Sequence, residues 1–350
     1  MSAFALYKMP HSGSCTLLSQ ISKTPLRLQS FRHLGGQQGF VFAPFAISNS
    51  TPLLVIEPEK AETFPVSALP DVPDDSFSFL KEPSLPREER ASYTEDFAKF
   101  HDKVVTGALK KIVLSRSSLV RLNKPSQPMA WFKAACARYP SQFVALVSTP
   151  ASGTWMMATP EVLLECQDNL CHTMALAGTI PAPKAANYPI DEGKLWSKKN
   201  QIEQQLVAYY IGDKLSAFSD SVQAVGPKTV KAGDLLHLCT DFKVSLPLKT
   251  NLGSVIEALH PTPAVCGLPK EKALNFIQNN EHSPRNYYAG FAGPMAFHGM
   301  TRLFVSLRCM QIFPKSCLLY AGGGLLADSK EASEWAETEA KMGTMRHLLG

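Results

Sequence analysis

Residues 320–342 read YAGGGLLADSKEASEWAETEAKM and join an apolar run to a charged helical pattern through three consecutive glycines. Glycine has no Cβ, so the backbone at Gly322–Gly324 permits very close approach of another group. Asp328 or Ser329 can cap the helix that follows, because a side-chain oxygen placed there accepts hydrogen bonds from the free amides of the first turn. The stretch therefore predicts a close-approach segment followed by a capped helix.

On that helix Glu334, Glu337 and Lys341 are spaced so that two carboxylates and an ammonium share one face. Such a face can hold a hard cation and an anionic ligand beside glycine N–H donors. The same pattern also fits a solvated surface helix after a loop. This segment alone does not decide between the two interpretations.

The composition is that of a globular protein with a sizeable core. The chain has 350 residues, of which 45% are apolar and 19% charged, and this length allows one large or two ordinary domains. The net charge of +5 is spread along the sequence without a basic run. We therefore expect no nucleic-acid partner, and the charge is compatible with an anionic small-molecule substrate.

The eight cysteines form no CxxC pair, and their spacing relative to the histidines is not that of metal ligands. Most lie in apolar runs, so we expect buried free thiols in a reducing cytosol. The N-terminus lacks the apolar core of a signal peptide. No run approaches the roughly 20 apolar residues of a transmembrane helix. These features predict a soluble cytoplasmic protein with no membrane partner.

The first part of the chain has the sequence pattern of β-strands, and an exposed loop is expected to follow it. Residues 1–66 alternate short apolar runs with turn residues, which is typical of strands. Residues 67–91 are rich in proline and acids and favour an exposed loop, either between domains or within one. Ser92 and Glu95 fit a capping box at the start of the next helix.

Two ionisable residues stand beside apolar strand-like runs. Lys111 heads KIVLSR; it is either the exposed end of a strand or, if buried, a general base with a lowered pKa. Glu161 follows Pro160 and precedes VLLEC; its carboxyl is either a general acid with a raised pKa or an edge-strand acid beside a turn. Further on, Gly178 and Thr179 offer a close backbone approach and a hydroxyl.

Several other residues have an ordinary structural interpretation. Residues 191–216 form an amphipathic helical pattern in which Glu203 has polar neighbours and is expected to be solvated. His237 has apolar neighbours, which favours a hydrogen-bonded core residue over a metal ligand. A helix is also expected over residues 129–138.

The remaining segments complete the fold prediction. Residues 259–267 hold too many prolines for a helix or central strand and predict a rigid loop. Residues 301–312, TRLFVSLRCMQI, predict one strand that ends near Arg308. Many strands with interspersed helices and no fixed repeat indicate an α/β or α+β protein with large sheets and peripheral helices.

Seven segments resemble the chorismate-utilising enzymes, and within them the isochorismate synthases, in the order of that family. They are KIVLSR, ATPEVLLE, ALAGT, LLHLCT, LHPTPAVCGLP with Glu281 and Arg285, SLR at 306–308, and AGGGLLADSKEASEWAETEAK. The resemblance implies a single large domain of antiparallel-rich sheets. Residues 92–350 would be the chorismate-binding catalytic region, and residues 1–91 a variable N-terminal β portion of the same domain.

The resemblance also implies roles for individual residues. Lys111 matches the general base that activates water for attack at C2 of chorismate, and Glu161 matches the general acid for the departing C4 hydroxyl. Mg²⁺ is the implied cofactor, with Glu203 and Glu337 as ligands and Glu334 in support. The implied substrate-binding residues are Ala177, Gly178, Thr179, His237, Ala264, Arg308, Gly322, Gly323 and Lys341.

Water is the expected nucleophile because related enzymes that use ammonia or a covalent lysine differ at Lys111 or Ala177. Salicylate synthases share Lys111, so subsequent pyruvate elimination stays open. Asn200 and Gln204 replace an aspartate and a histidine of the family pattern around Glu203, which keeps a non-catalytic chorismate- or metal-binding relative open as well. We expect a monomer without an obligatory protein partner that serves menaquinone, siderophore or salicylate synthesis, with menaquinone favoured.

Overall fold

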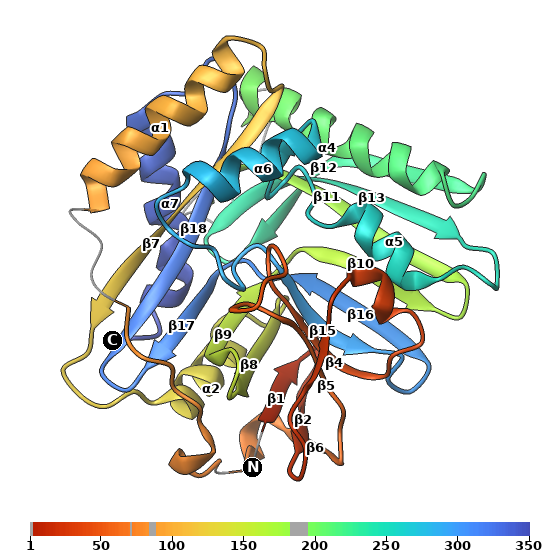
Figure 1. The fold of residues 1–350 in the computed structure, drawn as a ribbon, viewed down its shortest axis with the longest axis vertical. Helices are drawn as coiled ribbons and strands as arrows, with labels where there is room; N and C mark the ends of the chain where they lie inside the picture. The colour runs from red at the N-terminus through yellow and green to blue at the C-terminus, as the bar shows by residue number, and fades with distance from the viewer. Residues whose placement is uncertain (1–2, 71, 84–88, 183–194) are drawn as a thin grey trace.

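Two large antiparallel sheets dominate the structure, which is a computed structural model of the chain (Figure 1). It describes residues 3–70, 72–83, 89–182 and 195–350. Each sheet has nine strands, and every pairing between neighbouring strands is antiparallel. The predicted mixed fold with antiparallel-rich sheets is therefore confirmed.

Sheet A contains strands from both halves of the chain. Its order is β14 (Gly267–Leu268), β7 (Lys111–Arg121), β18 (Ser316–Leu325), β17 (Cys309–Phe313), β9 (Gly153–Thr159), β8 (Phe143–Thr149), β1 (Ala3–Lys8), β2 (Ser14–Gln20) and β6 (Lys60–Pro65). The pairing of β1 with β8 places N-terminal residues inside the same sheet as the later strands.

Sheet B is built in the same mixed way. Its order is β12 (Val222–Ala232), β13 (Leu235–Ser245), β11 (Leu170–Pro181), β10 (Val162–Gln167), β16 (Met300–Val305), β15 (Phe291–Met295), β4 (Gly39–Ala43), β5 (Leu53–Ile56) and β3 (Leu26–Leu28). Here β4 joins the N-terminal strands to β15.

Six α-helices surround the sheets in the part of the chain that the structure describes. They are α1 (Glu89–Val105), α2 (Pro128–Arg138), α4 (Lys198–Ser216), α5 (Leu252–Leu259), α6 (Lys270–Asn280) and α7 (Glu331–Arg346). Short 3₁₀ turns occur at η1 (Phe31–Leu34), η2 (Val66–Ala68) and η3 (Asp74–Ser76). None of the described helices is long and apolar enough to cross a membrane.

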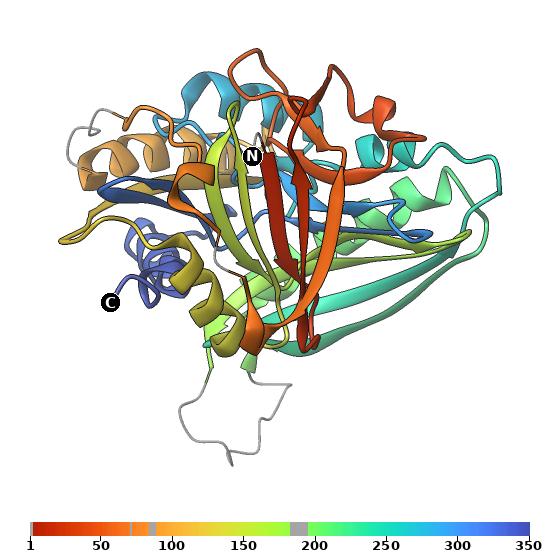
Figure 2. The same cartoon turned by 90° about the horizontal axis from the view of Figure 1, so that it is seen from below.

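Successive residues of each strand in sheet A point to opposite faces of the sheet, and each face packs into a different core. Ala5, Val147 and Trp155 belong to the main core, which also contains apolar residues of sheet B and of helices α1, α4, α5 and α6. The alternate residues, such as Phe4 and Leu146, pack with α2 and α7 in a second core. Figure 2 shows α2 and α7 together on one side of this sheet.

The chain crosses between the sheets at two neighbouring points. Pro160 and Glu161 link β9 of sheet A to β10 of sheet B, and residues 306–308 link β16 of sheet B to β17 of sheet A. Backbone hydrogen bonds hold the crossings together, from Val305 N to Glu161 O (2.9 Å) and from Ala158 N to Arg308 O (3.1 Å). The prediction of one strand over residues 301–312 was wrong, because the chain changes sheets within it.

Three other local predictions need correction. Helix α1 begins at Glu89, upstream of the proposed Ser92 capping box. The loop at 67–91 is not wholly exposed, since Val72 and Phe77 are buried in the second core. Helix α4 begins at Lys198, with Ser197 as its N-cap, and residues 191–194 of the predicted helix lie outside the described residues.

Helix α7 begins at Glu331, with Lys330 rather than Asp328 or Ser329 at its N-cap. The Ser329 hydroxyl instead accepts a hydrogen bond from Leu326 N at 3.0 Å, because it closes the preceding turn. Arg116 of β7 fixes the helix against sheet A. Its guanidinium lies 3.7 Å from the centroid of the Trp335 ring, and its Nε donates to Thr338 Oγ1 at 2.7 Å.

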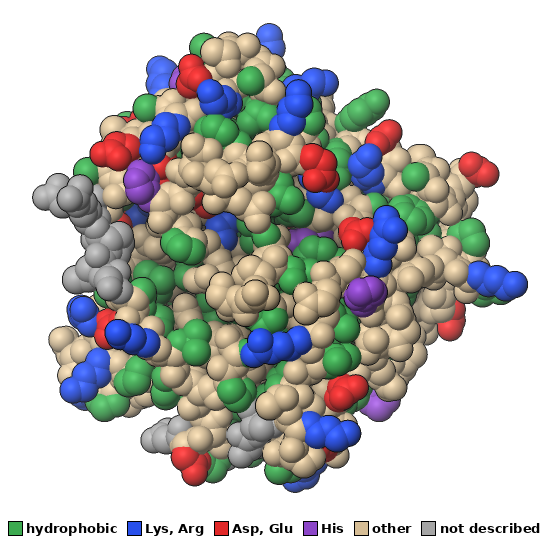
Figure 3. Space-filling model, in the orientation of Figure 1, with side chains coloured by type: hydrophobic (Ala, Val, Ile, Leu, Met, Phe, Trp, Pro, Cys, Tyr) green, Lys and Arg blue, Asp and Glu red, His purple; other side chains and the backbone are tan. Residues whose placement is uncertain are grey.

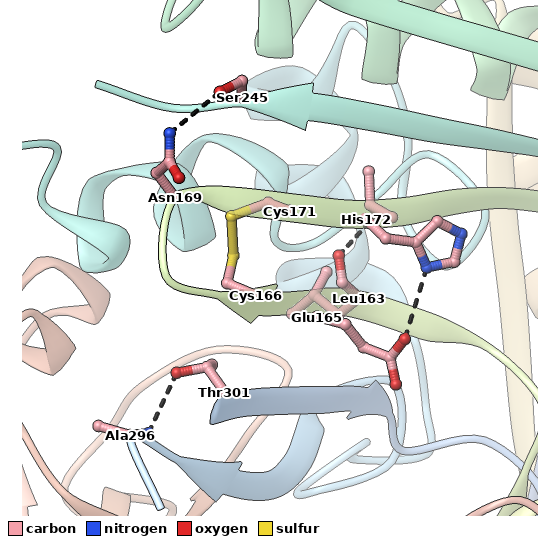
Figure 4. The surroundings of a disulfide bond; sticks show 10 residues. Leu163, Glu165, Cys166, Asn169, Cys171, His172, Ser245, Ala296 and Thr301 are labelled. Carbon is pink, nitrogen blue, oxygen red and sulfur yellow. Dashed lines mark hydrogen bonds and ion pairs between the residues drawn. A yellow bond between two sulfur atoms is a disulfide. The ribbon is translucent and has the colours of Figure 1, made fainter. Parts of the chain in front are cut away.

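A disulfide joins Cys166 and Cys171, which pair directly across the β10–β11 hairpin (Figure 4). The expectation of free thiols was wrong for these two residues. The two cysteines lie on adjacent strands in register, a relation that their separation in sequence does not reveal. The other six cysteines are free and buried, as predicted.

A buried ion pair joins three segments near β7. Arg285 donates to Glu281 Oε2 (2.6 Å), to Val265 O in the loop before β14 (2.6 Å) and to Val113 O in β7 (2.8 Å). Glu281 Oε1 also accepts from Ser115 N at 2.7 Å. Both charged side chains are 3% exposed, so each depends on the other for its solvation.

Replacing Arg285 with methionine should lower the free energy of unfolding by about 3–5 kcal/mol, because the Glu281 carboxylate is left buried without its partner. Arg121→Met is the matched control. Arg121 pairs with Glu82 but is 60% exposed, so its loss should cost at most about 1 kcal/mol. Urea denaturation of both variants checks the difference, and equal losses would contradict the assigned importance of the buried pair.

Candidate active site

A cavity lies at the two sheet crossings and extends to β18 and α7. Among the residues predicted from the sequence, those that line it are Glu161, Ala177, Gly178, Thr179, Glu203, His237, Ala264, Arg308, Gly322, Glu337 and Lys341. Lys111, Gly323 and Glu334 do not line the cavity directly. Its free volume of ≈ 50 Å³ holds only a few water molecules, so the side chains must separate before a ring-sized molecule can enter.

Lys111 and Glu203 form a buried ion pair at one wall, with Lys111 Nζ 3.0 Å from Glu203 Oε1. Lys111 is 0% exposed, so the interpretation as an exposed strand end is excluded. Glu203 is buried as well, and the expectation of a solvated residue was wrong, because its face of α4 packs on β11. Burial alone would raise the pKa of Glu203, but the charges of Lys111 and Lys199 outweigh it and lower that pKa.

The glycines of β18 make this approach possible. A Cβ at Gly324 would lie 2.1 Å from Glu203 Oε1 and 2.8 Å from Lys111 Cε. A Cβ at Gly323 would lie 2.9 Å from Glu334 Oε2, on the side that faces α7. The strand alternation therefore directs Gly322 and Gly324 toward the cavity and Gly323 toward the α7 carboxylates.

Helix α7 contributes two carboxylates with lysine partners. Glu337 Oε1 accepts from Lys341 Nζ at 2.6 Å, and this ammonium also donates to Gly322 O at 2.9 Å. Glu334 pairs with Lys199 of α4, while its other oxygen, Oε2, is buried without a hydrogen-bond partner. Burial raises the pKa of Glu334, and the neighbouring Glu337 adds to this increase against the effect of Lys199.

These carboxylates fit a hard cation by their chemistry. Within the described ranges, no three His, Cys, Asp or Glu side chains gather closely enough to form a complete metal cluster. Mg²⁺, however, usually takes one or two carboxylates and completes its shell with water and substrate oxygens. The Oε2 atom of Glu334, buried without a hydrogen-bond partner at Gly323, is an oxygen that such a cation would satisfy, and Glu203 and Glu337 bring further carboxylates to the glycine segment.

Glu161 occupies the first sheet crossing and is 2% exposed. Burial raises the pKa of its carboxyl to about 8, although Lys111, Arg308 and Lys341 act in the opposite direction. A carboxyl with this pKa is largely protonated at neutral pH and can donate a proton. The interpretation as an edge-strand acid is excluded, because the neighbouring β10 lies in the middle of sheet B.

Arg308 occupies the second crossing and is held by His237. The histidine Nδ1 lies 3.0 Å from Gly178 O, which can only accept, so Nδ1 carries the proton. Its Nε2 then accepts from Arg308 Nη2 at 3.1 Å. Burial keeps the pKa of His237 well below its usual value, in agreement with a neutral ring. Arg308 Nη1 is buried without a partner, so the cavity presents an unused cationic donor.

Two tyrosines were missed from the sequence. Tyr288 and Tyr320 line the cavity, and their rings stack with centroids 5.6 Å apart. They lie in the RNYYA and CLLYAGGG segments, where no local pattern marks them as cavity-facing. The Gln204 side chain is directed to sheet B. Its amide donates to Ala175 O and Thr240 Oγ1, so this departure from the family pattern supports packing of α4 on that sheet.

Positive and negative side chains are interspersed over the molecular face in Figure 3, with no large field of one sign among the side chains drawn there. Ionisable side chains also gather in the cavity, where Glu161, Glu203, Arg308, Glu337 and Lys341 form part of the lining. This arrangement suits a small charged ligand better than an extended polyanion.

Isochorismate synthases are among the known proteins that are similar to this chain in sequence. The isochorismate synthase MenF of Escherichia coli K12 is 30% identical over 249 residues, which cover 70% of this chain and 57% of that protein. The isochorismate synthase DhbC of Bacillus subtilis 168 is 32% identical over 263 residues, covering 71% and 65%. The chain thus spans less than two thirds of the length of either relative.

Solved structures share the fold over the whole chain. DhbC from Bacillus anthracis superposes with a TM-score of 0.83 at 25% identity, covering 100% of this chain and 96% of that one. Anthranilate synthase component I from Streptococcus pneumoniae has a TM-score of 0.69 at 18% identity over 98% and 89%, and shows the fold alone. The sequence profile described as chorismate binding enzyme matches residues 57–350. The chain belongs to the family of chorismate binding enzymes.

Proposed function

We propose that this protein is a Mg²⁺-dependent isochorismate synthase, which moves the hydroxyl of chorismate from C4 to C2. The observation that carries the proposal is the buried Lys111 beside a cavity that also contains Glu161 as a neutral acid. The relatives MenF and DhbC, both isochorismate synthases by name, support the same activity.

Lys111 and Glu161 each carry out one of the two proton transfers. Lys111 takes a proton from water as the water oxygen bonds to C2. The ring double bond shifts, the C4–O bond breaks, and Glu161 gives its proton to the departing hydroxyl, which leaves as water. One water molecule is consumed and one released, so the reaction is an isomerisation.

Other residues of the cavity bind and orient the substrate. The free Nη1 of Arg308 and the ammonium of Lys341 suit the two carboxylates of chorismate. Mg²⁺, held by Glu203 and Glu337 with Glu334 beside them, would supply positive charge to the ring carboxylate. Ala177, Gly178 and Thr179 shape the opposite wall at the end of β11.

We also propose that the product serves menaquinone synthesis, in line with the menaquinone-specific MenF of Escherichia coli. The siderophore route is the alternative, in line with the 2,3-dihydroxybenzoate-specific DhbC of Bacillus anthracis. The protein would act as a cytoplasmic monomer. Product analysis decides whether pyruvate is then eliminated to form salicylate.

Purified protein incubated with chorismate should produce isochorismate with Mg²⁺ and none with EDTA, as followed by liquid chromatography. Lys111→Met should abolish the product, because water loses its base, while Lys110→Met serves as the matched control on the adjacent exposed residue. Equal turnover in the two variants would refute the role of Lys111. Formation of salicylate and pyruvate would show that the protein is a salicylate synthase. Binding of chorismate without any conversion would show that it is a non-catalytic relative.

The rate should fall as the pH rises through about 8, because Glu161 must be protonated to act as the acid. This falling limb is expected in kcat/KM measured between pH 6 and 10. The affinity of Glu161→Gln for chorismate, measured by calorimetry over the same range, should not change near pH 8, because this variant lacks the titrating carboxyl. A rate that stays constant above pH 9, or an affinity of the variant that still changes near pH 8, would assign the pH dependence to another group.

Gly324→Ala should lower turnover about a hundredfold, because the added methyl displaces Glu203 and Lys111 from their positions. Gly343→Ala is the control: a Cβ there meets nothing nearer than His347 Cε1 at 3.7 Å, and alanine favours the helix. It should keep full turnover. Steady-state kinetics and circular dichroism of both variants separate loss of the site from loss of the fold, and an active Gly324→Ala protein would show that the close approach is dispensable.

A further inference from the structure

Two buried polar atoms of helices α1 and α7 have no hydrogen-bond partner within the part of the chain that the structure describes. They are the Tyr93 hydroxyl of α1 and Glu334 Oε2 of α7, and both residues are 2% exposed. A hydroxyl can donate a hydrogen bond and a carboxylate oxygen accepts one. Because an unpaired polar atom in the interior is unfavourable, a contact that joins these two atoms would satisfy both.

Helices α1 and α7 approach each other on one face of sheet A. Leu114 of β7 and Gly323 of β18 are direct partners across the two strands, so their side-chain positions lie on the same face. Glu334 Oε2 lies there, 2.9 Å from the position of a Cβ at Gly323, and α1 packs on both strands. The Tyr93 ring meets the ring of Trp335 edge-on, with centroids 5.2 Å apart. Tyr93 therefore contacts the residue that follows Glu334 in α7.

The electrostatics agree with this placement. Burial raises the pKa of Tyr93, and the largest of the charges that act on this pKa is that of Glu334, which raises it further. Arg116, Glu331 and Glu337 have smaller effects on it. Tyr93 therefore keeps its hydroxyl proton and can donate it to a carboxylate in a hydrogen bond.

The Glu334 carboxylate is held by an ion pair at one of its oxygens. Lys199 of α4 pairs with Oε1, while Oε2 lies at Gly323. The Ser329 hydroxyl also lowers the pKa of Glu334, but it accepts from Leu326 N and makes no hydrogen bond of normal geometry with Oε2. A carboxylate oxygen has two lone pairs, so Oε2 can accept from a hydroxyl and still face a cation.

We propose that Tyr93 is a positioning residue for Glu334. Its hydroxyl donates to Glu334 Oε2, after a small rotation of the two side chains or through one water molecule, and keeps the carboxylate in the orientation that supports Mg²⁺. Tyr93 does not line the active-site cavity, so it acts through Glu334 and not on the substrate. The contact itself is independent of the proposed function, whereas its effect on Mg²⁺ rests on that function.

Thermal unfolding in the presence of EDTA tests the contact without metal. Tyr93→Phe keeps the ring and removes only the hydroxyl, so it should lower the unfolding temperature by about 1–2 °C through loss of one hydrogen bond. In a Glu334→Met background, which lacks the acceptor, the same change should cause no further decrease. Tyr209→Phe, at a tyrosine of α4 that is 79% exposed, is the matched control and should unfold as the parent does.

Two results of this unfolding experiment would overturn the contact. Removal of a hydroxyl that has no partner would leave the unfolding temperature of Tyr93→Phe unchanged or raise it. Equal decreases with and without the Glu334 carboxylate would show that the Tyr93 hydroxyl acts on some other group.

Calorimetric titration of the full chain with Mg²⁺, without chorismate, tests the effect on the carboxylate site. Tyr93→Phe should weaken Mg²⁺ binding about tenfold, and Tyr209→Phe should bind as the parent does. The Mg²⁺ concentration that gives half the maximal rate should rise by the same factor, while kcat at saturating Mg²⁺ changes less than twofold. A general loss of structure would lower kcat as well.

Unchanged Mg²⁺ affinity in Tyr93→Phe would overturn the positioning role, and a loss of affinity in Ser329→Ala instead would assign that role to Ser329. If the unmodified protein bound no Mg²⁺, the proposed function and the positioning role would both fail. The unfolding experiment would still decide whether the contact between Tyr93 and Glu334 exists, so the two failures are distinguishable.

Discussion

The absence of side chains at Gly322–Gly324 is the constraint on which the site depends. A single Cβ at Gly324 would occupy the position of the Glu203 carboxylate, and one at Gly323 would press on Glu334. Because β18 carries no side chains at these three residues, α4 and α7 can both bring carboxylates to the same short length of backbone. The burial of Lys111 follows, since Glu203 arrives as its counter-charge from α4.

Two kinds of buried acid result from this packing. Glu203 has two lysines near it, and their charge outweighs burial, so it stays ionised. Glu161, at the first sheet crossing, has no carboxylate-binding partner of comparable strength, and burial prevails. Two glutamates that line the same cavity thus differ in their acidity, because the pKa of Glu203 is lowered and that of Glu161 is raised.

The sequence could predict elements whose signal is local. The strand-like runs at Lys111 and Val162, helix α2 and the proline-rich loop at 259–267 depend on periodicity and on proline, and they were confirmed. The predictions were wrong where contacts between distant segments of the chain determine the structure. One pattern over residues 301–312 is two strands because the chain changes sheets at Arg308, and the bond between Cys166 and Cys171 depends on strand register.

The sequence by itself determined the alternating strands, the glycine segment and the order of motifs that indicates the chorismate binding enzymes. Only the tertiary structure decided whether Lys111, Glu161 and Glu203 are buried, that Tyr288 and Tyr320 face the cavity, and that Arg308 keeps a free donor. The physical reason is that hydrophobic periodicity is set by near neighbours in the chain. Desolvation and ion pairing depend on groups brought together from far apart, such as Lys111 and Glu203, and no local pattern contains them.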